Sequence, residues 1–93
     1  MTNSEIAHIF FEMARMLELK DENPFKIRAY DKAARTILTL TGELAELDAR
    51  GELESLDGIG KELAEKIRIM LRGDLPPAYR DLQIAVPPGL LKM

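Results

Sequence analysis

Cysteine and tryptophan are absent from this 93-residue sequence, and His8 is its only histidine. Without cysteine the chain has no disulfide, no thiolate nucleophile and no cysteine-bound metal. A single histidine also argues against Ser–His or Cys–His catalysis and against histidine-ligated metal sites. No apolar run approaches the roughly 20 residues that a transmembrane helix needs, and the N-terminus lacks a signal-peptide pattern. We therefore expect a cytoplasmic protein that does not bind membranes.

The size and the charge of the chain limit what it can do. Its 93 residues, 46% of them hydrophobic, suffice for one small packed domain, which we expect to be a monomer. The net charge of −3 is unfavourable for binding nucleic acid. Basic residues nevertheless outnumber acidic ones by four to one in residues 24–42 and by four to two in residues 60–72. If these two segments share a face, its contact with phosphate would be salt-sensitive.

Hydrophobic periodicity predicts an all-α fold. Apolar residues recur at helical spacing, and the sequence has no strand pattern. Thr2 and Glu5 have the spacing of a capping box, and Asn23-Pro24 is a typical helix start. Helices are expected at about 4–19, 24–39, 43–50, 52–56, 61–72 and 77–84. We predict a compact bundle of about four main helices that forms one domain over residues 1–85, followed by an extended segment or linker at 86–93.

Residues 56–67 carry the most informative motif, Leu-Asp-Gly-Ile-Gly-Lys-Glu-Leu-Ala-Glu-Lys-Ile. Gly58 and Gly60 let the backbone take positive φ and approach a ligand closely. The first amides of the following helix have no internal partner and carry the positive end of the helix dipole, which favours phosphate. Apolar Ile59 is best explained as an anchor in the core, and small Ala64 as a close helix crossing. The pattern predicts a helix-hairpin-helix that contacts nucleic-acid backbone, or a plain helical connector without a ligand.

Two further motifs accompany the hairpin. Asn-Pro-Phe-Lys-Ile-Arg-Ala-Tyr-x-x-Ala-Ala occupies residues 23–34, and Val-Pro-Pro-Gly-Leu-Leu occupies residues 86–91. With these motifs, essentially the whole chain resembles the N-terminal 8-kDa domain of family-X DNA polymerases, most closely the bacterial members. In those enzymes the Pro-Pro-Gly-Leu-Leu segment precedes a second hairpin and the polymerase palm. The resemblance leaves open whether this is a domain of a longer polymerase or a stand-alone copy, and the sequence has no palm-like strands for a polymerase active site.

The resemblance implies DNA binding without sequence preference, at the 5′-phosphate side of a gap or nick, as in base excision repair. The hairpin residues that would contact the backbone are Gly58, Ile59, Gly60 and Lys61. Auxiliary charges would come from Lys26, Arg28, Lys32, Arg35 and Arg68. No cofactor is required, but a monovalent cation (Na⁺ or K⁺) would bridge phosphate to three backbone carbonyls, those of Glu54, Leu56 and Ile59.

In several members of this family the domain is also a 5′-deoxyribose-phosphate lyase. The nucleophilic lysine of the family falls on Lys66, and a supporting tyrosine falls on Tyr30. Lys66 lies at the border of the apolar stripe of its helix, where partial burial would favour the neutral amine that attacks a sugar aldehyde. An ordinary lysine that reaches phosphate from solvent is the alternative. Two positions depart from the lyase pattern, because Glu62 replaces a basic residue and Phe25 replaces a phosphate-binding histidine.

Three functions therefore stay open. DNA-backbone binding in a repair polymerase is the leading hypothesis, and an active lyase is the second. A protein-interaction module that has lost DNA binding is the third, supported by the net charge and by the acidic segment 43–57. DNA affinity that falls with salt and with Lys61→Glu would support the first two, whereas no detectable binding at low salt would support the third.

Overall fold

The computed structural model describes residues 1–85, so the extended segment expected at 86–93 lies outside the described residues. Residues 1–85 form five α-helices and one 3-10 helix and contain no strand, which confirms the all-α fold. The elements are Asn3–Leu19 (α1), Pro24–Leu38 (α2), Leu44–Ala49 (α3), Leu53–Ser55 (η1, the 3-10 helix), Lys61–Leu71 (α4) and Pro77–Ala85 (α5). No helix in this part of the chain is long and apolar enough to cross a membrane.

Local sequence explains where the first two helices begin. Thr2 and Glu5 form the predicted capping box: the Glu5 amide donates to the Thr2 hydroxyl at 3.1 Å, and the Thr2 amide donates to the Glu5 carboxylate at 2.8 Å. The bond from the Thr2 amide holds the pKa of Glu5 below its usual value. At the start of α2, the Asn23 side chain accepts from the Phe25 amide at 2.8 Å. Pro24 occupies the first helical position, where its missing N–H removes no bond.

The segment between α2 and α4 is less helical than its pattern predicts. The helix expected at 43–50 is the six-residue α3, and the helix expected at 52–56 is the single turn η1. Gly51 takes a φ of +69°, which ends α3 and leaves too short a segment for an α-helix before the hairpin turn. Buried Leu44 and Leu53 anchor the two short elements to the core.

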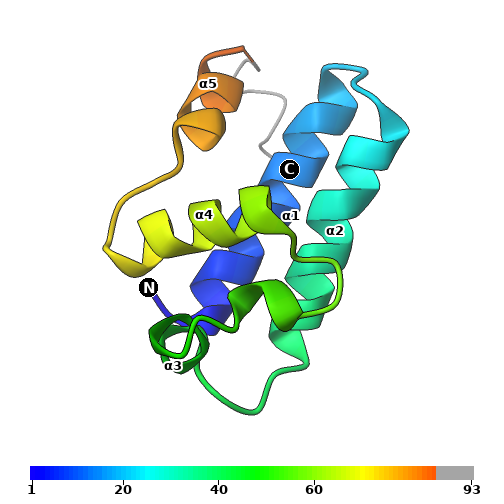
Figure 1. Cartoon of the computed structure of the whole chain (residues 1–93). Coiled ribbons are helices and arrows are strands. Elements are labelled where there is room, and N and C mark those ends of the chain that lie inside the picture. The colour runs from blue at the N-terminus through cyan, green and yellow to red at the C-terminus, as the bar shows by residue number, and fades with distance from the viewer. Residues whose placement is uncertain (86–93) are drawn as a thin grey trace.

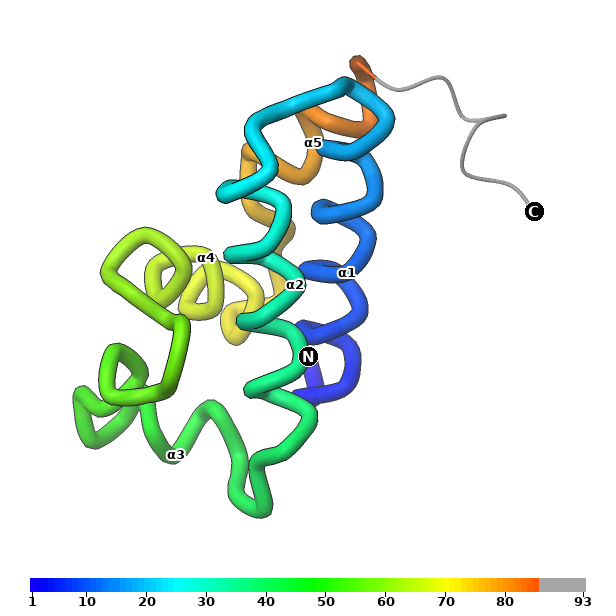
Figure 2. Tube along the Cα trace, turned by 90° about the vertical axis from the view of Figure 1, so that its right-hand side faces the viewer, coloured from blue at the N-terminus to red at the C-terminus, as the bar shows by residue number. Residues whose placement is uncertain are grey.

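α1 and α2 lie side by side and antiparallel, and the other elements pack around this pair (Figure 1). α4 crosses the pair and begins beside α2, so the hairpin turn that precedes α4 lies against α2. α3 and η1 lie near the end of α2 (Figure 2). α5 lies at the opposite end, near the connection between α1 and α2. This arrangement brings residues of α2 and of the hairpin together although they are distant in sequence.

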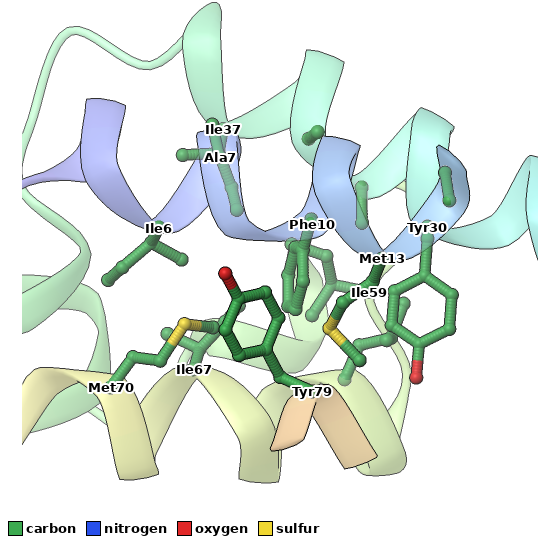
Figure 3. Close-up of a cluster of buried hydrophobic side chains, with 14 of the residues drawn as sticks. Ile6, Ala7, Phe10, Met13, Tyr30, Ile37, Ile59, Ile67, Met70 and Tyr79 are labelled. Atoms are coloured by element: carbon green, nitrogen blue, oxygen red, sulfur yellow. The ribbon is translucent and has the colours of Figure 1, made fainter. Parts of the chain in front are cut away.

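The core lies between the α1–α2 pair and α4 (Figure 3). Phe10 of α1 and Tyr30 of α2 meet edge to face, with ring centroids 5.7 Å apart. Ile59 is 2% exposed and Ala64 is fully buried, which confirms that the hairpin is anchored in the core. α5 joins the core through Tyr79, which also donates its hydroxyl hydrogen to a carboxylate of α1 at 2.9 Å.

Candidate functional site

The hairpin turn is a type II β-turn over residues 56–59. The Ile59 amide donates to the Leu56 carbonyl at 3.1 Å, and Gly58, at the third position, has a φ of +81°. Asp57, at the second position, has no positive φ, which excludes the mirror-image type I′ turn. A Cβ on Gly58 would also lie 3.1 Å from two carbons of the Lys32 side chain. The positive φ therefore favours glycine at this position, and a larger residue would also require the Lys32 side chain to shift.

No side chain caps the start of α4. Gly60 is the N-cap residue, and its carbonyl accepts the first helical bond, from the Ala64 amide, at 2.9 Å. The hydrogen bonds within residues 1–85 leave the amides of Lys61, Glu62 and Leu63 without an acceptor. These amides, together with the positive end of the helix dipole, favour an anion at this point.

A cleft of about 490 Å³ opens beside this helix start, between α2 and α4. Its lining residues are Lys26, Ala29, Tyr30, Gly58, Gly60, Lys61, Glu62, Leu63 and Lys66. Within the described part of the chain, none of its three lysines makes an ion pair. The fold therefore brings together predicted site residues of α2, of the hairpin turn and of α4, and it sets three unpaired cations around an open helix start.

Tyr30 and Lys66, the residues expected to perform lyase chemistry, line the same cleft. Tyr30 is 5% exposed. Burial and, secondarily, the nearby Glu62 carboxylate raise the pKa of the Tyr30 hydroxyl to about 12, so the phenol is protonated at neutral pH. Lys66 is half-buried, as its position on α4 predicts. Among residues 1–85 no ion pair joins Lys66 to Glu62, although the two lie one helical turn apart.

Four other cations predicted to bind DNA do not line the cleft. Arg68 is the most constrained of them, because its Nε donates to Asp48 at 3.0 Å and its Nη1 donates to Glu65 at 3.3 Å. The bond to Asp48 raises the pKa of the Arg68 guanidinium. The other three are Lys32, paired with Asp57 at 3.5 Å, Arg35, paired with Asp31 at 2.9 Å, and Arg28, 5.6 Å from the centre of the Phe25 ring. DNA contacts by these four residues stay predictions, and much of their charge is used within the protein.

One residue that holds the hairpin turn was not found by the sequence analysis. The Thr36 hydroxyl of α2 donates to the Asp57 carbonyl at 2.9 Å. Next to this bond, the Lys32 side chain lies against Gly58 and reaches the Asp57 carboxylate. A threonine within a helix carries no pattern that signals a bond to a residue 21 positions away. Only the packing of the hairpin turn on α2 reveals the contact.

The backbone carbonyls predicted to hold a monovalent cation lie on η1 and the turn. The Leu56 carbonyl accepts the turn bond, whereas the hydrogen bonds within residues 1–85 leave the Glu54 and Ile59 carbonyls without a donor. Neutral carbonyl oxygens are suitable ligands for Na⁺ or K⁺, so the donor set fits such an ion. In the same part of the chain, no group of three histidine, aspartate or glutamate side chains could hold a metal ion.

Two comparisons relate the chain to known proteins. Residues 1–74 match a family described as a helix-hairpin-helix domain. All 93 residues align, at 32% identity, with the DNA polymerase/3'-5' exonuclease PolX of Bacillus subtilis (strain 168). The aligned part is 16% of that protein, so this chain spans about a sixth of the length of the curated relative that it matches. Both findings confirm the resemblance that the motifs indicated.

Proposed function

The chain belongs to the helix-hairpin-helix domain family, and on this premise we propose that it binds DNA backbone without sequence preference. The proposed ligand is the 5′-phosphate side of a gap or nick, and the proposed setting is a family-X repair polymerase, in which a polymerase palm would be the partner domain. The similarity to PolX supports this setting. The proposed binding surface is the cleft between α2 and α4.

The observation that carries the proposal is that lysines without ion pairs lie next to a helix N-terminus without a cap. Lys26, Lys61 and Lys66 line one cleft, and the free amides of the first turn of α4 begin beside it. Lysines supply the long-range attraction for phosphate, and amides supply directed hydrogen bonds. Because the net charge of the chain is −3, we expect binding to be weak and to fall steeply with salt.

A salt titration with gapped DNA tests the proposal. Wild-type protein should bind DNA that carries a 5′-phosphate in the gap more tightly than the same DNA without it. Lys61→Glu should weaken binding at low salt by about tenfold or more, since it places a carboxylate beside the phosphate. Arg72→Glu is the matched control, because Arg72 follows the far end of the same helix and makes no ion pair within residues 1–85. Equal losses in both variants, or no binding at low salt, would contradict the proposed surface; the second result would favour a protein-interaction module.

A second candidate function is 5′-deoxyribose-phosphate lyase activity, favoured by the position of half-buried Lys66 beside Tyr30 in the cleft. The Lys66 amine would add to the C1′ aldehyde of the opened sugar and lose water to form a Schiff base. A water molecule acting as base would then remove a C2′ proton as the C3′–O bond breaks, which leaves a 5′-phosphate on the DNA. Hydrolysis of the Schiff base by water would release the unsaturated sugar phosphate and restore the Lys66 amine. Tyr30, protonated at neutral pH, would hydrogen-bond the substrate, whereas Glu62 in the same cleft opposes an anionic sugar phosphate.

Borohydride trapping on DNA with a 5′-deoxyribose phosphate tests the lyase. Lys66→Arg keeps the positive charge and cannot form the Schiff base, so it should bind DNA and give no adduct. Lys61→Arg is the control, since Lys61 lines the same cleft and should still permit trapping at Lys66. An adduct that survives in Lys66→Arg would place the nucleophile elsewhere. The absence of an adduct in wild type, with DNA still bound, would leave the domain as a DNA-binding module without lyase activity.

We also propose that a monovalent cation joins the hairpin to phosphate through the carbonyls of Glu54, Leu56 and Ile59. The free Glu54 and Ile59 carbonyls support this site. Replacing K⁺ by tetramethylammonium at constant ionic strength would test it, because that ion is too large for a carbonyl cage but screens charge equally. DNA affinity should fall severalfold after the exchange, and unchanged affinity would contradict the cation site.

A further inference from the structure

The contact between Thr36 and the hairpin turn has no part in the function proposed so far. Thr36 lies on α2, half-buried, and its hydroxyl donates to the Asp57 carbonyl at 2.9 Å. Asp57 and Gly58 are the two central residues of the type II turn. The peptide that joins them is the one whose orientation distinguishes a type II turn from a type I turn. A hydrogen bond to its carbonyl therefore selects between two conformations of the turn.

The orientation of this peptide also determines where the Gly58 amide points. In a trans peptide the C=O and N–H groups point in opposite directions, and no cis peptide bond occurs in the described residues. Because the Asp57 carbonyl points toward Thr36, the Gly58 amide points away from it. Gly58 is exposed and lines the cleft, and within residues 1–85 its amide has no acceptor. The amide is thus free to donate to a ligand.

We infer that Thr36 is a positioning residue for DNA binding. Its hydroxyl fixes the orientation of the Asp57–Gly58 peptide, so that the Gly58 amide can donate to a phosphate oxygen. This inference rests on the proposed function, because it concerns the affinity of the same hairpin for the DNA backbone. Thr36 itself carries no charge and does not line the cleft. It acts through the backbone, and its removal should leave the number of charged contacts with DNA unchanged.

Lys32 supports the same turn from the same helix. Its side chain lies over Gly58, where a Cβ would lie 3.1 Å from its Cγ and Cδ, and its Nζ lies 3.5 Å from the Asp57 carboxylate. Thr36 and Lys32 are one helical turn apart and hold consecutive residues of the turn. α2 therefore contacts both the carbonyl and the side chain of Asp57, which restricts the rotation of the peptide between Asp57 and Gly58.

The test replaces the hydroxyl without changing the shape of the side chain. Thr36→Val removes the donor, and Thr36→Ser keeps it. Thr39→Val is the matched control, because the Thr39 hydroxyl donates to the Thr36 carbonyl at the end of the same helix and does not reach the hairpin. We expect Thr36→Val to weaken binding to gapped DNA by about three- to tenfold, the effect of one net hydrogen bond, while Thr36→Ser and Thr39→Val stay within about twofold of wild type.

Two further readouts distinguish a positioning role from a direct DNA contact and from a general loss of stability. The salt dependence of binding should keep its slope in Thr36→Val, whereas Lys61→Gln should lower the slope by about one ion. Amide hydrogen exchange without DNA should accelerate at Ile59, the donor of the turn bond, in Thr36→Val but not in Thr36→Ser. The exchange of Ile67, in the buried part of α4, should stay unchanged and report an intact fold.

Each alternative result has a separate meaning. Equal affinity of wild type and Thr36→Val, or equal losses in the valine and serine variants, would overturn the positioning role. A lower salt slope in Thr36→Val would show that the variant loses a phosphate contact directly, which also overturns it. If wild type binds no DNA at all, the proposed function fails, and the exchange rate of Ile59 then decides by itself whether Thr36 orders the turn.

Discussion

The first amides of α1 and of α4 both lack an acceptor within their own helix, but only those of α1 are satisfied by a side-chain cap. At α1, Thr2 and Glu5 satisfy each other's backbone amides through a capping box, with bonds of 2.8 and 3.1 Å. At α4, Gly60 offers no side chain, and the first amides are left without a partner in the described part of the chain. The N-terminus of α1 is therefore capped, whereas the N-terminus of α4, beside the cleft, is uncapped. This difference is the one that the proposed function requires, because uncapped amides at the start of α4 can donate to a phosphate.

The energetic cost of the open start is small. Glycine is only a few tenths of a kcal/mol worse than serine or aspartate at an N-cap, because its backbone reaches the required conformation and lets water solvate the amides. The Gly60 backbone is extended, with φ −90° and ψ −169°, a conformation that any residue adopts. Stability therefore does not require glycine here. Because Gly60 has no side chain, a bulky anion can reach the amides at the start of α4.

The cations show the same contrast. Lys26, Lys61 and Lys66 line the cleft without ion pairs among residues 1–85, whereas Arg68 on the same helix as two of them is bonded to two carboxylates. Exposed ion pairs add little to stability, but they do reduce the charge that is available to a ligand. An acidic protein can thus keep one local positive surface by pairing its cations elsewhere.

The largest expected effect comes from adding a side-chain cap to α4, like the cap that α1 has. Gly60→Asp adds a capping carboxylate in a position where nothing lies within 4 Å of the new Cβ. We expect a gain of about 0.5 kcal/mol in unfolding free energy and a loss of about tenfold or more in DNA affinity, because the carboxylate occupies the amides and repels phosphate. Denaturant titration and DNA binding measure the two effects.

Gly42→Asp is the control for the previous variant, since it adds the same charge at another glycine with no atom within 4 Å of its Cβ position. DNA affinity should fall much less in Gly42→Asp than in Gly60→Asp. Similar losses in the two variants would show that net charge, and not access to the α4 amides, sets the affinity.

The opposite change removes the side-chain cap of α1. Thr2→Ala removes the hydroxyl that caps the helix, and we expect a loss of about 1 kcal/mol in unfolding free energy with unchanged DNA affinity. Thr2→Ser, which keeps the hydroxyl, should restore most of the stability. Thermal unfolding and DNA binding in one buffer measure both effects. A clear drop in DNA affinity would contradict the prediction that the α1 cap contributes to stability and not to DNA binding.

A smaller effect should distinguish unpaired from paired cations on α4. Lys61→Gln should lower the slope of log affinity against log salt by about one, while Arg68→Gln should leave the slope unchanged. Arg68→Gln should instead lower stability, because it leaves Asp48 without its partner. Equal changes of slope in the two variants would indicate that Arg68 leaves its carboxylates and contacts DNA.

The smallest effect at neutral pH concerns Tyr30. Burial and Glu62 raise the pKa of Tyr30 from 10.0 to about 12, so the unfolded chain releases this proton at a lower pH than the folded chain. Tyr30 therefore costs no stability below pH 10 and lowers stability as the pH rises from 10 to 12. Tyr30→Phe should lose less stability than wild type over that window, as measured by urea midpoints. An identical alkaline loss in the two proteins would contradict the burial of the Tyr30 hydroxyl.

Much of the site could be predicted because its signals are local. Gly58 indicates the turn, Ile59 indicates an anchored hairpin, and the positions of Lys61 and Lys66 relative to the apolar stripe follow from the helical period. The positive φ expected at Gly60 is wrong, because Gly60 is the extended N-cap residue of α4. The all-α fold and the starts of α1 and α2 follow from periodicity and capping residues in the same way. The prediction was less accurate at η1, where buried Leu53 gives an apolar signal but Gly51 leaves too little chain for an α-helix.

The sequence by itself determined the helices, the turn and the kinds of charge near it, because backbone conformation is governed by residues within about one helical turn of each other. Only the tertiary structure decided which cations are free. Asp48 pairs with Arg68 from 20 residues away, and no local pattern encodes that distance. The same holds for Thr36 and Asp57, whose bond exists because α4 crosses the α1–α2 pair and carries the turn onto α2. Side-chain pairing across the fold depends on packing, and packing selects which of the predicted site residues remain open to a ligand.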